Sequence, residues 1–102
     1  MEKVAIAADH GGFELKEDIK LFLKETGYET VDFGTHNNNS VDYPDFGIKV
    51  AEAVSRGDIQ KGILICGTGV GMSIVVNKFP DVRGALCNDI YTARMGRKHN
   101  DS

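Results

Sequence analysis

The chain has 102 residues, of which 41% are hydrophobic and 26% charged, a composition typical of a soluble globular protein. Its net charge of −3 at pH 7 argues against a nucleic-acid partner, which usually needs a basic stripe, but permits a small anionic substrate. No apolar run approaches the roughly 20 residues of a membrane helix, and the N-terminus resembles no secretory signal. We therefore expect one cytoplasmic domain over residues 1–102, with no membrane or nucleic-acid partner.

Short apolar runs alternate with amphipathic stretches, a pattern typical of successive βα units around a parallel sheet. The first helix is expected to bury Phe13, Leu15, Ile19, Phe22 and Leu23. Right-handed crossovers would give an α/β fold with a doubly wound parallel sheet, a flavodoxin-like three-layer α/β/α sandwich with strand order 2-1-3-4. The predicted elements, in chain order, are a strand at 4–8, a helix at 13–27, a strand at 28–33, a helix at 44–57, a strand at 62–66, a helix at 72–78, a strand at 82–87 and a helix at 90–98.

Two segments rich in reactive and small residues follow the first and third predicted strands, at residues 9–12 and 66–71. In a 2-1-3-4 sheet the topological switch lies between these two strands. Ligands of open α/β sheets bind outside the carboxyl ends of the strands at such a switch. We therefore predict a ligand site between the two loops.

Gly67, Gly69 and Gly71 alternate in the turn between the third strand and the third helix. Glycines in such a turn let the backbone approach a ligand closely, and the helix start offers N–H groups to an anion. The spacing matches neither the Rossmann fingerprint nor a Walker loop. The alternative is a tight turn that requires a positive φ, because glycine serves turns in many proteins.

Cys66 stands immediately before this turn, where a helix start favours the thiolate and makes a cysteine a competent base or nucleophile. The alternative is a buried, inert thiol, the commoner fate of cysteine. Cys87 ends the fourth predicted strand with no glycine turn after it, and we predict that it belongs to the core. The two cysteines show neither metal-ligand spacing nor a disulfide framework, and no metal is expected.

Asp9 and His10 follow the first strand, at the mouth of the predicted crevice. Histidine can bind a phosphate or act as an acid or base near neutral pH, and the Asp9 carboxylate could accept hydrogen bonds from sugar hydroxyls. The alternative for Asp9 is an N-cap of the first helix, and that for Tyr43 is simple packing. His99 and Asn100 end the fourth helix, where such a pair is most often a solvated terminus.

Five linked motifs occur in order along the whole chain: residues 9–12 (DHGG), 32–35 (DFGT), 40–45 (SVDYPD), 66–72 (CGTGVGM) and 94–100 (RMGRKHN). Together they resemble the ribose-5-phosphate isomerase B family, which also includes the galactose-6-phosphate isomerase subunits. The resemblance implies an enzyme that interconverts aldose and ketose phosphates, above all ribose 5-phosphate and ribulose 5-phosphate. It also implies that no metal or organic cofactor takes part.

The resemblance implies a role for each candidate residue. Cys66 matches the position of the family's base, which moves a proton between C1 and C2 through an enediolate. Met72 matches the position where another branch of the family has a glutamate base. The backbone N–H groups from Gly67 through Gly71, including Gly69 and Val70, resemble an anion hole for the developing oxyanion. The other implied roles are ring opening by His99 with Thr68 nearby, hydroxyl binding by Asp9 and Asn100, phosphate binding by His10, and a pocket wall at Tyr43.

The resemblance further implies a homodimer with its active site at the subunit interface. Family members continue past His99 and Asn100 with a fifth strand, further helices and arginines that clamp the phosphate, so we expect residues 1–102 to lack that part. Two alternatives stay open. One is a galactose-6-phosphate isomerase subunit, which acts on a longer sugar, and the other is a catalytically inactive α/β module that binds a phosphosugar without turnover.

Overall fold

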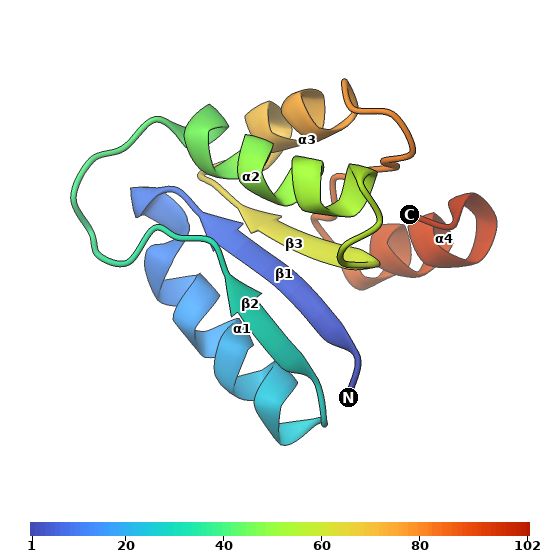
Figure 1. Cartoon of the computed structure of the whole chain (residues 1–102), viewed down its shortest axis with the longest axis horizontal. Helices are drawn as coiled ribbons and strands as arrows, with labels where there is room; N and C mark the ends of the chain where they lie inside the picture. Colours follow the sequence, from blue (N-terminus) through green and yellow to red (C-terminus); the bar gives the residue numbers. More distant parts are fainter.

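The computed structural model describes all 102 residues and contains a parallel sheet with helices on both faces (Figure 1). The three strands are β1 (Lys3–Ala8), β2 (Glu29–Asp32) and β3 (Lys61–Ile65), in the order β2-β1-β3. The helices are α1 (Phe13–Glu25), α2 (Tyr43–Ser55), α3 (Val70–Val76) and α4 (Ile90–Asn100), and a short 3-10 turn, η1 (His10–Gly12), precedes α1. None of the helices is both long enough and apolar enough to cross a membrane. The predicted doubly wound, flavodoxin-like α/β fold is confirmed, with one strand fewer.

β1 is the central strand and the most deeply buried segment of the chain. It pairs in parallel with β2 on one side and with β3 on the other. Residues 4–8 are all buried, because helices cover both faces of a central parallel strand. β1 therefore holds the residue that follows it, Asp9, at a defined place beside the end of β3.

α2 covers one face of the sheet and α3 packs against α2, with the main hydrophobic core between α2 and the sheet (Figure 1). Pro44 occupies the first turn of α2, where its missing N–H costs no hydrogen bond. The buried face of α2 points into this core. The core cluster consists of Ala5, Ala7, Val50, Ala53 and Ile59, with Val31, Phe33, Phe46, Val54 and Leu64 packed against it.

α1 covers the opposite face, but not with all the side chains that the sequence pattern predicts. Leu23 is buried, whereas Leu15 and Phe22, which were expected inside, are exposed. Lys16 takes a place on the covered side and is fully buried. An apolar residue is not required there, because the Lys16 ammonium is paired with the Asp32 carboxylate.

Residues 82–87, predicted as the fourth strand, form no strand, so β3 is an edge of the sheet. The side-chain amide of Asn77 donates to the carbonyl of Gly84 and accepts from the Gly84 N–H, both at 2.9 Å. Leu86 packs over Gly69, where an added Cβ would lie 2.4 Å from Leu86 Cδ1. These contacts attach the segment to α3 and its preceding loop instead of to the backbone of β3. The strand order 2-1-3-4 is therefore corrected to 2-1-3.

In the view of Figure 1, α4 lies on the side of the molecule where β3 starts, away from the loop that joins β3 to α3. Asp89 caps the helix, since its carboxylate accepts the N–H of Thr92 at 2.7 Å. Cys87, just before this cap, is exposed, and its predicted place in the core is wrong. The reason is that residues 82–87 join no sheet, so no second layer covers the end of the segment.

Candidate functional site

A pocket of about 460 Å³ opens where β1 and β3 end side by side. The N–H of Asp9 donates to the carbonyl of Ile65 at 3.1 Å, which brings the loop after β1 against the loop after β3. The pocket thus lies outside the carboxyl ends of two neighbouring parallel strands, where such folds hold ligands. Its wall consists of Asp9, Tyr43, Cys66, Gly67, Thr68, Val70, Gly71 and Ile74.

Cys66 directly follows β3, is half-buried and lines this pocket. The N–H of Gly69 donates to Cys66 Sγ at 3.2 Å across the turn. α3 has only seven residues, so its dipole is small. The hydrogen bond from the Gly69 N–H is therefore the main polar interaction of the sulfur. Gly69 supports the pocket wall without being part of it.

The three glycines of the turn differ in their surroundings, and only two of them are required by the structure. Gly69 has a φ of +81°, in the left-handed region that favours glycine. Gly71 packs against the ring of Tyr43, where an added Cβ would lie 2.5 Å from Cε1. Gly67 has neither constraint, because an added Cβ there would meet nothing within 4 Å. The tight-turn interpretation therefore accounts for Gly69, while Gly67 leaves open space at the pocket.

The backbone N–H groups of loop 66–71 are only partly engaged. Val70 donates to Thr68 Oγ1 at 3.2 Å, and Gly69 donates to Cys66 as described. The N–H groups of Gly67 and Thr68 donate to no group of the chain. These two amides are free to bind an oxyanion in the pocket.

Asp9 and His10 both make local hydrogen bonds. Asp9 Oδ1 accepts the N–H of Gly12 at 3.0 Å, so Asp9 caps the 3-10 turn η1 that precedes α1, and not α1 itself, whose N-cap is Gly12. Asp9 also lines the pocket. His10 is exposed and lies outside the pocket wall. Its Nδ1 accepts the N–H of Val41 at 3.2 Å. A neutral ring that accepts at Nδ1 carries its proton on Nε2, which leaves that nitrogen as a donor.

His99 and Asn100 are not part of this pocket. They are exposed in the last turn of α4, which Figure 1 shows well apart from the loop after β3. The next residue, Asp101, has a φ of +53° and is paired with Arg83 at 3.1 Å and with Arg97 at 2.5 Å. One chain alone therefore does not bring the predicted ring-opening residue to the thiol.

The strongest charge cluster joins α1 to the end of β2, outside the pocket wall, and it was not predicted from the sequence. Lys16 and Lys20 of α1 both donate to Asp32 Oδ2, at 2.5 and 2.8 Å. Partial burial disfavours the charged form of Asp32, but these donors and the N–H of Gly34 outweigh it and lower the pKa of Asp32 to about 2. A signal existed, because Lys16 follows Phe13 by three residues and so shares its helix face. Ile74, which lines the pocket, was not predicted from the sequence either.

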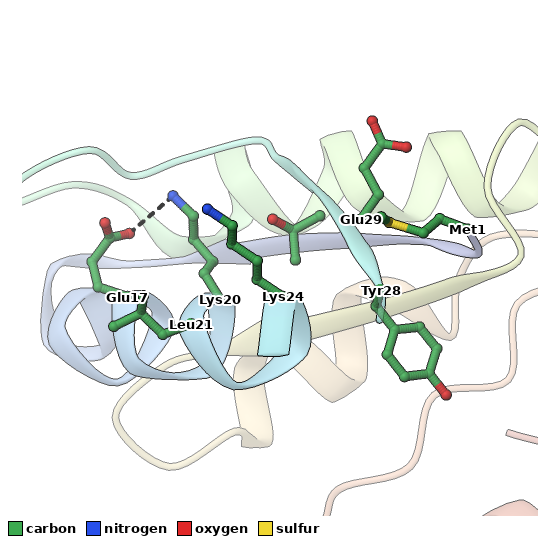
Figure 2. Close-up of a pocket in the computed structure, with 8 residues that line it drawn as sticks. Met1, Glu17, Lys20, Leu21, Lys24, Tyr28 and Glu29 are labelled. Carbon is green, nitrogen blue, oxygen red and sulfur yellow. Dashed lines mark hydrogen bonds and ion pairs between the residues drawn. The ribbon is translucent and has the colours of Figure 1, made fainter. Parts of the chain in front are cut away.

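A larger cavity, of about 800 Å³, lies between α1 and the start of β2 (Figure 2). Figure 2 shows Glu17 paired with Lys20, at 3.4 Å, and Lys24 beside them on α1. This cavity is near the amino ends of the strands and contains no cysteine or histidine, so we assign the functional site to the smaller pocket. Its wall consists of Met1, Glu17, Lys20, Leu21, Lys24, Tyr28, Glu29 and Thr30.

The fold and the pocket together define a flavodoxin-like α/β protein with a pocket at its topological switch point, where such folds hold small molecules. The model of a known family, described as ribose/galactose isomerase, matches residues 4–102. The chain belongs to the ribose/galactose isomerase family, and the resemblance drawn from the five motifs is confirmed.

Individual relatives agree with this assignment. The chain is 47% identical over 102 residues to ribose-5-phosphate isomerase B of Escherichia coli strain K12, covering 100% of this chain and 68% of that relative. It is similar to the structure of Clostridium thermocellum ribose-5-phosphate isomerase B, with a TM-score of 0.95 and 60% identity over 98% of this chain and 68% of that one. It is also similar to the Trypanosoma brucei type B ribose 5-phosphate isomerase, with a TM-score of 0.94 and 51% identity over 100% of this chain and 70% of that one.

Proposed function

We propose that this chain supplies the chemistry of a sugar-phosphate aldose–ketose isomerase that interconverts ribose 5-phosphate and ribulose 5-phosphate. The observation that carries the proposal is the pocket at the ends of β1 and β3, where the Cys66 thiol, the Asp9 carboxylate and the free N–H groups of Gly67 and Thr68 meet. A base, an acceptor for sugar hydroxyls and donors for an oxyanion are the groups that this reaction needs. The names of the relatives, ribose-5-phosphate isomerase B, support the same substrate.

In the proposed reaction the Cys66 thiolate removes the proton from C2 of the open-chain aldose. The electron pair of the C–H bond forms the C1–C2 double bond, and the C1 carbonyl oxygen becomes the enediolate oxyanion. The thiol then returns the proton to C1. The hydroxyl proton on O2 passes to O1, so that C2 becomes the ketone and no atom is gained or lost. The Gly69 N–H, 3.2 Å from the sulfur, can also donate to it in the thiolate form.

The oxyanion is the group with the greatest need for stabilisation during this sequence. Gly67 and Thr68 supply free N–H groups in the loop that carries the base. Fixed donors of this kind need no reorganisation when the charge develops, and each is typically worth about 10²–10³-fold in turnover. The missing side chain of Gly67 leaves room for the substrate to approach these amides.

We assign binding roles at the two ends of the substrate. The free oxygen of Asp9 would accept sugar hydroxyls, because only Oδ1 is used by the cap of η1. His10 would bind the phosphate, since its bond from Val41 leaves the Nε2–H free to donate. Tyr43, packed against Gly71, would form part of the pocket wall around the sugar.

Because His99 and Asn100 lie away from the pocket of their own chain, we propose that a second copy of the chain supplies them. In a two-fold homodimer, each site would combine Cys66 of one copy with His99 and Asn100 of the other, where His99 assists ring opening with Thr68 nearby. Val70 and Ile74 beside the pocket are 49% and 55% exposed, which gives such a partner an apolar surface to cover.

A coupled assay that follows the formation of ribulose 5-phosphate from ribose 5-phosphate tests the proposal, with galactose 6-phosphate as the competing substrate because the family description names both sugars. Turnover of ribose 5-phosphate that survives a metal chelator is the expected result. Preferred turnover of galactose 6-phosphate would reassign the substrate. Binding of both sugars without turnover would identify a phosphosugar-binding module instead.

A further inference from the structure

Lys16 is the one fully buried charged side chain of the molecule, and the proposed reaction does not use it. Its Nζ donates to Asp32 Oδ2 at 2.5 Å and to Glu17 Oε2 at 3.0 Å, and it lies 5.4 Å from the centre of the Phe13 ring. A buried ammonium is costly unless it is paired, so its geometry is strongly determined by Asp32. The pair joins α1 to the last residue of β2.

Asp32 also binds the backbone of the loop that follows β2. Its second oxygen, Oδ1, accepts the N–H of Gly34 at 2.8 Å. Gly34 is buried, has a φ of +109° and packs against Phe46, where an added Cβ would lie 2.7 Å from the ring. The position of Gly34 is therefore set by Asp32 on one side and by α2 on the other.

Gly34 and Thr35 in turn hold the end of β1. The N–H of Ala8 donates to the Gly34 carbonyl at 2.7 Å, and the N–H of Thr35 donates to the Ala8 carbonyl at 2.8 Å. Ala8 is the last residue of β1, and Asp9 follows it into the pocket. A continuous series of hydrogen bonds thus runs from the Lys16 ammonium to the residue before the Asp9 carboxylate.

We propose that Lys16 and Asp32 are positioning residues for the site: through Gly34 and Ala8 they set the orientation of Asp9 and thereby the affinity for the sugar. The pair does not line the pocket, and the hydrogen bonds that connect it to the site run through the backbone of residues 32–35 and 8–9. In the proposed function Asp9 contacts sugar hydroxyls that do not react. Its misplacement should therefore weaken binding of the ground state and of the transition state equally, which raises KM with little change in kcat.

Lys20 provides the matched control within the chain. It donates to the same oxygen of Asp32 at 2.8 Å, but from a side chain that is 29% exposed. Water can replace an exposed donor, and such pairs are worth little. Lys16→Met and Lys20→Met therefore remove the same charge and the same kind of bond, yet only the first removes a buried constraint.

The first test does not depend on activity and measures amide hydrogen exchange in the intact chain. Lys16→Met and Asp32→Asn should speed exchange at residues 8–12 and 33–35 by about tenfold, the effect of losing roughly one hydrogen bond of local stability. Lys20→Met should leave these segments unchanged. Ile59→Ala, a core substitution near the start of β3, controls for general destabilisation and should raise exchange throughout the sheet.

The second test rests on the proposed function and uses ribose 5-phosphate kinetics of the same variants. Lys16→Met and Asp32→Asn should raise KM by about tenfold with kcat within a factor of about two, whereas Ile59→Ala should change neither. Asp32→Asn keeps an oxygen for the Gly34 N–H and serves if Lys16→Met does not fold. Unchanged exchange at residues 8–12, or exchange indistinguishable from Ile59→Ala, overturns the inference. An inactive wild-type chain overturns only the proposed function, since the exchange result stands alone.

Discussion

Cys66 and Cys87 differ in surroundings more than their sequence positions suggest. Cys66 is half-buried in the pocket wall and accepts the Gly69 N–H, whereas Cys87 is exposed with its Sγ 3.6 Å from the Ala85 carbonyl. Access alone therefore favours alkylation of Cys87, and total reactivity is a poor guide to which thiol is functional. Protection by a ligand and loss of turnover on substitution separate the two.

We predict that Cys66→Ala lowers turnover of ribose 5-phosphate by about 10²–10⁴-fold or more, because the proton between C1 and C2 loses its base. Binding of the sugar phosphate, measured by calorimetry, should be largely retained. Cys87→Ala is the matched control and should keep normal turnover. In the wild-type chain, bound ribose 5-phosphate should slow iodoacetamide labelling of Cys66 and leave that of Cys87 unchanged. Normal turnover in Cys66→Ala would exclude a thiolate base.

A second prediction concerns His99, whose proposed role is limited to opening the ring form of the sugar. His99→Ala should reduce turnover of a furanose substrate by about 10²–10⁴-fold and that of an open-chain substrate much less. Parallel rate measurements on the two kinds of substrate provide the comparison. Equal losses on both would mean that His99 only positions the sugar.

Among the elements, α1 and β2 are joined by the charge cluster of Lys16, Lys20, Glu17 and Asp32. The cluster replaces the apolar contact expected for that side of α1. An ion pair stabilises only while both partners are charged, so the attachment of α1 to the sheet depends on pH.

We predict a specific acid sensitivity from this cluster. The pKa of Asp32 is about 2 in the folded chain, against an ordinary 3.8, despite partial burial that acts in the opposite direction. A lowered pKa contributes stability above the ordinary value, and that contribution is lost as pH falls from about 4 to about 2. Urea unfolding measured at several pH values across this range should show the free energy of unfolding of the wild type decreasing as the pH falls. The decrease should be smaller in Asp32→Asn. An equal slope in both would mean that other carboxylates dominate.

For the whole molecule, β3 is a sheet edge with no further strand, and apolar side chains remain exposed around the pocket and on α4. Ile90 and Tyr91 are 72% and 73% exposed. Uncovered edges and apolar patches favour association with another chain. A 2-1-3-4 order would have put the edge at residues 82–87, whereas the observed edge is β3. Sedimentation should therefore show a dimer or larger species in place of a monomer.

A shared site makes complementation the decisive measurement at this scale. Cys66→Ala and His99→Ala should each be inactive, and mixing them after unfolding and refolding together should restore activity. Random pairing places an intact Cys66 opposite an intact His99 in about a quarter of the sites. Continued inactivity of a mixed dimer, shown to form by mass spectrometry, would mean that Cys66 and His99 act within one chain.

The sequence by itself determined the alternation of strands and helices, the place of the switch between β1 and β3, and the family. These features depend on local patterns: a buried run before Asp9, and a cysteine followed by alternating glycines, are visible without knowing what lies nearby. The predictions of a strand at residues 82–87 and of a buried Cys87 were wrong. The side chain of Asn77 binds the backbone N–H and carbonyl of Gly84, a tertiary contact that competes with pairing of this segment to β3. Only the tertiary structure decided that Lys16 is buried against Asp32, and that His99 lies apart from Cys66. Burial, ion pairing and distance belong to pairs of residues far apart in the chain, and no local pattern contains them.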